Sequence, residues 1–114
     1  MANIYKNSKL DLTAATATTL YTVPSNSRSI IKSILVSSDS GSATTITLDL
    51  FAGDPASAAK FTLFKVKAVA ANASEQLLTE PLIMLENEVL QVTAADANRL
   101  FVIASILEIN REDR

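Results

Sequence analysis

Alternation of apolar and polar residues with a period of two constrains the fold of this chain more than any other feature. The clearest example is Thr44–Phe51, where three aliphatic side chains alternate with Thr and Asp over positions 45–50. This pattern is typical of a β-strand with one buried face. The residues expected in the core from this segment and two later ones are Ile46, Leu48, Leu50, Leu90, Val92, Phe101 and Ile103.

Segments of this kind recur along the chain, and turn-forming residues separate them at intervals of about 8–12 residues. The expected strands are Ile4–Leu12, Thr18–Val23, Arg28–Ser38, Thr44–Phe51, Lys60–Val69, Glu75–Thr79, Leu82–Leu85, Glu88–Ala94 and Arg99–Ile109. No amphipathic helix lies between them, and a short helix at Pro55–Lys60 is less favoured than a strand connector. We therefore predict an all-β chain with a single domain over residues 1–114, a β-sandwich or jelly roll of about eight antiparallel strands.

The two ends of the chain carry separate expectations. Residues 1–18 are expected to form an N-terminal arm or an edge strand, and residues 110–114 a charged C-terminal tail. Glu108–Arg114 mixes both signs of charge and is expected to be solvated. The first residues lack the apolar region of a secretory signal peptide, and the longest apolar runs are too short to span a bilayer.

The absence of His, Cys and Trp narrows the possible functions. His is the usual general base near neutral pH, and Cys is the best intrinsic nucleophile and a soft metal ligand. We therefore expect no enzymatic activity and no cofactor. We also expect no metal, because the turn at Asp39 lacks the further acidic ligands that calcium needs. A net charge of −2 gives no electrostatic signal for nucleic acid, and no membrane partner is expected.

Two expected strands are apolar on both faces, which a lone sandwich cannot bury completely. In Arg28–Ser38 one face holds Ile30, Ile34 and Val36 with Lys32, and the other holds Ile31 and Leu35. In Arg99–Ile109 one face holds Phe101, Ile103, Leu107 and Ile109, and the other holds Leu100, Val102, Ala104 and Ile106. Exposed apolar patches usually mark an interface, so we expect a homo-oligomer. The predicted interface residues are Ile31, Leu35, Leu100, Val102, Ile106, Lys65 and Lys67.

Lys65 and Lys67 are included because they are expected to share a strand face with Phe61 and Leu63. The favoured interpretation is protection of an edge strand, since Lys discourages pairing with another chain. The alternative is a contact with an acidic partner surface.

Two stretches resemble small β-sandwich proteins that are encoded in the structural-gene clusters of tailed bacteriophages. The first is Thr19–Phe51, in which a Thr-Leu-Tyr-Thr-Val-Pro strand precedes a small-residue turn and an Ile- and Lys-rich strand. The second is Ser74–Ile109, with its Leu-Leu-Thr-Glu-Pro-Leu run and its Leu-Glu-Ile ending. Together they cover most of residues 19–109. The chain departs from the pattern at the turn after Pro24, which reads Ser-Asn-Ser where Gly is common.

The resemblance implies a virion structural protein, in particular a capsid decoration or cement protein that binds the assembled phage head and stabilises it. The implied partner is the major capsid protein, and attachment at local three-fold positions implies a trimer. The expected location is the capsid surface of the virion, after synthesis in the bacterial cytoplasm. The alternatives are a tail or neck component and a module that binds host-surface glycans, although the chain has few aromatic residues to stack on sugars.

Overall fold

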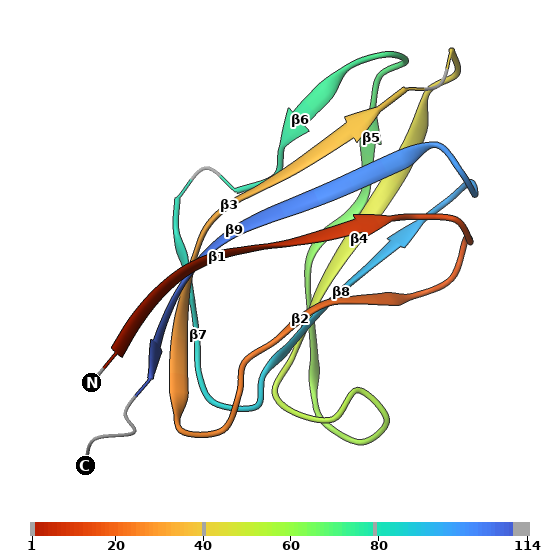
Figure 1. Cartoon of the computed structure of the whole chain (residues 1–114). Coiled ribbons are helices and arrows are strands. Elements are labelled where there is room, and N and C mark those ends of the chain that lie inside the picture. The colour runs from red at the N-terminus through yellow and green to blue at the C-terminus, as the bar shows by residue number, and fades with distance from the viewer. Residues whose placement is uncertain (1, 40, 79, 111–114) are drawn as a thin grey trace.

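The computed structural model describes residues 2–39, 41–78 and 80–110, and it is an all-β sandwich (Figure 1). Strands occur at every predicted place, and the predicted fold class is confirmed. They are β1 (Ala2–Asp11), β2 (Thr18–Thr22), β3 (Ser27–Ser38), β4 (Thr44–Phe51), β5 (Lys60–Val69), β6 (Ser74–Gln76), β7 (Leu82–Met84), β8 (Val89–Ala94) and β9 (Leu100–Asn110).

The strands form two antiparallel sheets that pack face to face. One sheet has the order β1-β9-β3-β6, with β7 also paired to β3, and the other has the order β2-β8-β4-β5. Apart from β4–β5 and β6–β7, which stay within one sheet, successive strands cross between the sheets, as in a jelly roll. The β1–β2, β3–β4, β5–β6 and β8–β9 connections gather at one end of the sandwich, at the right and upper right of Figure 1. The start of β1 and the end of β9 lie side by side toward the opposite end, where Ala2 pairs with Asn110.

Asparagine supplies the backbone conformation that several turns require. Asn26, Asn72, Asn87 and Asn98 all have positive φ values, between 54° and 70°. Asn adopts this left-handed region more readily than other residues with a β-carbon. In the turn after Pro24, Asn26 has a φ of 70°, and the Ser27 N–H donates to the Pro24 carbonyl at 3.2 Å. Asn26 therefore supplies the positive φ that a turn of this kind often obtains from glycine.

The core between the sheets is aliphatic, and the faces predicted for β4 and β8 are confirmed. Ile46, Leu48, Leu90 and Val92 are fully buried, and Leu50 packs against the core while partly buried. These residues lie directly opposite one another across the β4–β8 pair, Leu48 with Val92 and Leu50 with Leu90.

The face predicted for β9 is wrong. Leu100, Val102, Ala104 and Ile106 are buried, whereas Phe101 and Ile103 are 37% and 38% exposed. Both faces of this strand are apolar, so alternation alone cannot decide which one meets the opposite sheet.

A β-bulge explains a similar error in β3. Ile31 pairs with Ile106 and Ser33 with Ser105, which leaves Lys32 as an extra residue on β3. One inserted residue exchanges the faces of everything beyond it. Ile31, Ile34 and Val36 are therefore all fully buried, although they were expected on opposite faces.

The ends of the chain and the β4–β5 connection complete the fold. The N-terminal segment forms an edge strand, β1, which was one of the two alternatives for residues 1–18. Asp54 forms a single turn, in which its carbonyl accepts hydrogen bonds from the N–H groups of Ser57 and Ala58. Glu108, expected to be solvated, is buried. The predicted tail extends from the end of β9 into residues 111–114, which lie outside the described residues, as does Thr79 at the end of another predicted strand.

Candidate interaction surface

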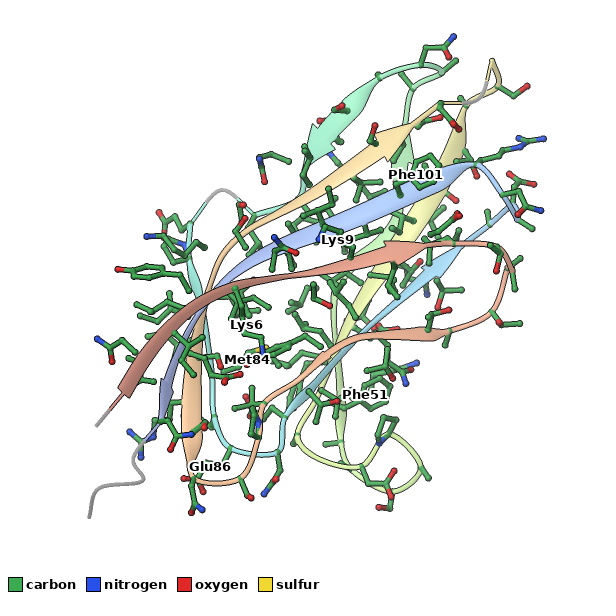
Figure 2. The ribbon with its side chains drawn as sticks, viewed as in Figure 1. Lys6, Lys9, Phe51, Met84, Glu86 and Phe101 are labelled. Atoms are coloured by element: carbon green, nitrogen blue, oxygen red, sulfur yellow. The ribbon has the colours of Figure 1, made fainter. Side chains whose placement is uncertain are left out.

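The outer face of the β1-β9-β3-β7 sheet carries an apolar surface that nothing else in the described chain covers completely. On the register of these strands, the side chains that point outward are Tyr5 on β1, Phe101, Ile103, Leu107 and Ile109 on β9, Ile30 and Leu35 on β3, and Ile83 on β7. We call these eight residues the outer apolar face. Figure 2 labels Phe101 on β9 and Lys9 on the neighbouring strand β1.

One row of this face crosses the whole sheet. Tyr5 lies opposite Leu107, Leu107 opposite Ile30, and Ile30 opposite Ile83, so that four apolar side chains line up across β1, β9, β3 and β7. The outermost two are the most exposed, Tyr5 at 75% and Ile83 at 65%. A contiguous exposed row of this kind is typical of an interaction site, whereas scattered apolar residues are not.

Charged side chains border the outer apolar face. Lys9 lies opposite Ile103, and Arg28 lies opposite Ile109, and both side chains are exposed. Asp11, opposite Phe101, adds a negative charge at one corner. The border is therefore more basic than acidic, although the chain as a whole carries a net charge of −2.

Most of the predicted interface residues lie elsewhere. Ile31, Leu100, Val102 and Ile106 are buried in the core of the monomer, so the expectation that they are exposed is wrong. Leu35 does lie on the outer apolar face, where it is half-buried opposite Ile103. β3 and β9 do have more apolar side chains than one sandwich buries, but on β9 they lie on the face opposite to the predicted one, and on β3 they are Ile30 and Leu35.

Lys65 and Lys67 lie on β5, an edge strand of the second sheet, as the favoured interpretation predicted. The expected shared face is confirmed only for Phe61 and Lys67, which lie opposite Leu50 and Ile46 on the inner side of β4, because the β4–β5 register shifts twice between them. Lys67 now lies opposite buried Ile46, and Phe64 lies opposite buried Leu48, so these two residues share a side. Lys65 falls within a bulge next to Val66, which has a φ of 54°.

A buried polar cluster joins the two sheets and had no signal in the sequence. The Tyr21 hydroxyl on β2 donates to Glu108 Oε2 on β9 at 2.5 Å and lies 2.7 Å from Ser29 Oγ on β3. The Nζ of Lys6 on β1 lies 3.5 Å from the same Glu108 oxygen. Burial, and then the hydrogen bond to Glu108, raise the pKa of Tyr21 above its usual value. The cluster therefore acts as a cross-link between sheets.

The outer face of the other sheet is polar apart from the buried pair Phe51 and Val89. A row of side chains crosses it from Thr19 through Gln91 and Asp49 to Thr62. Gln91 Nε2 donates to Thr19 Oγ1 at 3.2 Å, and Thr62 Oγ1 donates to Asp49 Oδ1 at 2.7 Å. The row contains none of the aromatic rings that commonly stack on sugars, so its hydrogen bonds serve the sheet itself.

The part of the chain that the structure describes holds no cluster of three or more acidic, His or Cys side chains arranged around a common metal position. Within the same residues, no helix has the length and apolar character needed to cross a membrane.

The fold is similar to that of viral and surface-appendage proteins. A protein from the Bacillus endospore appendages described as disulfide-linked pili superposes with a TM-score of 0.56 and 15% identity over 95% of this chain and 88% of its own. Infectious bursal disease virus strain Gx gives a TM-score of 0.54 and 12% identity over 99% of this chain and 32% of the viral chain. A chain of the virus-like particle of the Macrobrachium rosenbergii extra small virus gives a TM-score of 0.52 and 14% identity, over 99% of this chain and 82% of its own.

No protein-family model and no curated protein matches the chain. At these low identities, the structural likeness shows the fold alone. The chain thus has a jelly-roll fold of the kind found in viral capsid proteins. Because it contains no Cys, it cannot form the disulfide links for which the endospore appendages are named.

Proposed function

We propose that this protein is a virion structural protein that decorates the assembled head of a tailed phage and stabilises it. The observation that carries the proposal is the outer apolar face, an exposed sheet surface built from the two strands with the most apolar residues. The viral jelly-roll fold and the phage-like motifs in residues 19–51 and 74–109 support it. In this proposal the protein is made in the bacterial cytoplasm and ends on the capsid surface.

The outer apolar face would bind the major capsid protein by burying its exposed side chains. Each fully buried aliphatic or aromatic side chain contributes about 1.5–3 kcal/mol relative to exposure, so the row from Tyr5 to Ile83 is the expected centre of the contact. Lys9 and Arg28 at the border favour an acidic capsid surface, which would set the orientation and speed of binding.

The proposed role needs contacts alone. It requires neither catalysis nor a cofactor, in agreement with a sequence that has no His and no Cys. A homo-oligomer is part of the proposal. The phage resemblance implies a trimer, whereas the long regular edge of β1 favours a two-fold pair.

Binding to purified heads that lack this protein tests the proposal. Purified protein is mixed with such heads, and the pellet after sedimentation is analysed. We expect wild-type protein to co-sediment with heads, and Ile103→Lys, which places a charge in the outer apolar face, to stay in the supernatant. The matched control is Thr93→Lys on the polar outer face of the other sheet, which should bind as wild type does.

Three results would contradict the proposal. Binding to isolated tails or necks but not to heads would assign the protein to those parts. Binding to host-surface glycans in place of heads would favour the glycan-binding alternative. Equal binding by Ile103→Lys and Thr93→Lys would remove the outer apolar face as the contact.

A further inference from the structure

The four edges of the two sheets differ in how well they could pair with another chain. β5 is interrupted by two register shifts and by the left-handed Val66. β6 and β7 are three residues each. β2 has five residues and a register shift, and its Leu20 carbonyl already accepts a hydrogen bond of 2.5 Å from the Ser8 hydroxyl. Bulges and short strands are the usual means of blocking edge-to-edge pairing.

β1 has none of these protections. It pairs with β9 at ten consecutive positions, from Ala2 with Asn110 to Asp11 with Phe101, without a shift. It contains neither Pro nor Gly, and no other strand of the described chain pairs with it. Every second residue of a strand directs its N–H and C=O to the same side, so half of the main-chain groups of β1 point away from β9. A long regular edge of this kind is a ready template for another strand.

β1 carries two lysines, Lys6 on the inner side of the sheet and Lys9 on the outer side, and the inner one is engaged within the monomer. Lys6 points to the inner side of the sheet, where its Nζ lies 3.5 Å from Glu108 Oε2 and 5.8 Å from the centre of the Tyr21 ring. The buried Glu108 carboxylate holds this charge, so Lys6 does not reach across the edge.

We propose that β1 is the edge through which two copies of this chain join, antiparallel and related by a two-fold axis at Asn7. Directly opposite residues of a sheet share a face, so the axis must pass through a residue of β1 rather than between two. An axis at Asn7 places Ile4 opposite Leu10 and Tyr5 opposite Lys9, as an apolar pair and a cation next to an aromatic ring.

The two neighbouring registers give less favourable pairs of side chains across the strands. An axis at Lys6 places two lysines directly opposite each other, which is destabilising. An axis at Ser8 moves the partner of Ile4 to Leu12, which lies beyond the end of β1. The register at Asn7 also covers Ile4 and Tyr5, which are exposed in the monomer. The second copy is therefore the occupant that fits this edge.

Pairing at Asn7 would join two outer apolar faces into one continuous surface, because the row from Ile83 to Tyr5 ends at β1 in each copy. The inference does not rest on capsid binding. A two-fold pair can form whether or not the protein binds a phage head.

Light scattering and cysteine cross-linking of the full chain test the inference. We expect a mass of twice the 12.2 kDa of the chain at high protein concentration. Because the chain has no Cys, a single introduced thiol reports on one position. Opposite residues across an antiparallel pair have Cα atoms about 4.5–5.5 Å apart, within disulfide range. Asn7→Cys should therefore form a disulfide-linked dimer under mild oxidation.

Matched variants fix the register. Tyr5→Cys and Lys9→Cys should each cross-link poorly alone but readily when mixed, because each lies opposite the other in the proposed pair. Asn7→Asp should shift the chain to monomer by placing two carboxylates together, as should Asn7→Lys, and mixing the two should restore the dimer. Thr93→Asp adds the same charge on the other sheet and should remain dimeric.

Far-ultraviolet circular dichroism is used to check that each variant retains its strands. A wild-type monomer at high concentration, a mass of three chains, or cross-linking of Asn7→Cys no faster than of Asn3→Cys would each overturn the inference.

Discussion

Replacing two isoleucines of the same strand tests the face assignment of β9. Ile106 is 2% exposed and faces the opposite sheet, whereas Ile103 is 38% exposed on the outer apolar face. Both lie on β9 between β1 and β3, so the loss of β-propensity on changing Ile to Ala is similar at the two sites. The difference between Ile106→Ala and Ile103→Ala therefore reports mainly on burial.

The structure gives the expected magnitudes. Ile→Ala removes three carbons, and at about 0.8 kcal/mol for each buried carbon the loss at Ile106 is about 2.4 kcal/mol. A cavity inside the close-packed core raises this to about 3–4 kcal/mol. At Ile103 part of the removed surface already faces water and no closed cavity forms, so we expect about 1–1.5 kcal/mol.

Urea unfolding followed by circular dichroism measures both free energies of unfolding. The protein concentration must be low enough that light scattering shows monomer, because association would bury Ile103 further and stabilise the folded state. Equal losses at the two positions, or a larger loss for Ile103→Ala, would show that the two faces of β9 are assigned the wrong way round.

Three further predictions follow from the same structure. Leu48→Ala should cost about 2–5 kcal/mol, and Phe101→Ala, at a partly exposed site, clearly less; equal losses in urea unfolding would contradict this. The raised pKa of Tyr21 means that the folded state holds the phenol proton more tightly than the unfolded chain. Its contribution to stability should be complete below the unfolded pKa of about 10 and be lost as the pH rises above it, so Tyr21→Phe should flatten the alkaline fall in stability. Dialysis against EDTA should leave the melting temperature unchanged, and a fall of several degrees would point to a bound metal.

The positions of the strands could be predicted because their signal is local. Alternation in Thr44–Phe51 and the turn residues between segments depend on neighbours in the sequence. Asn26 could take the place of a glycine because its side chain tolerates positive φ. The fold class followed from the number of such strands and the absence of amphipathic helices between them.

The faces of β3 and β9 could not be predicted in the same way. A single extra residue at Lys32 changes the side on which every later side chain of β3 lies, and nothing in the local sequence marks it. Phe101 and Ile103 are larger than their neighbours on the other face, so apolar character alone favoured the wrong side. The sequence therefore predicted that β3 and β9 would leave apolar residues exposed, but most of the residues that it assigned to the exposed faces are buried.

Contacts between residues far apart in the sequence could not be predicted from local patterns. The hydrogen bond from Tyr21 to Glu108 joins residues 87 positions apart, and it depends on β2 and β9 lying in facing sheets. Without that topology, Glu108 looks like the first residue of a solvated tail.

Cryo-electron microscopy of purified virions that contain this protein tests the proposed function most directly. The proposal predicts density for the jelly roll at regular positions on the outside of the head, with the β1-β9-β3-β7 sheet turned toward the major capsid protein. Density for the protein confined to the tail or neck, or heads on which it is absent, would contradict it.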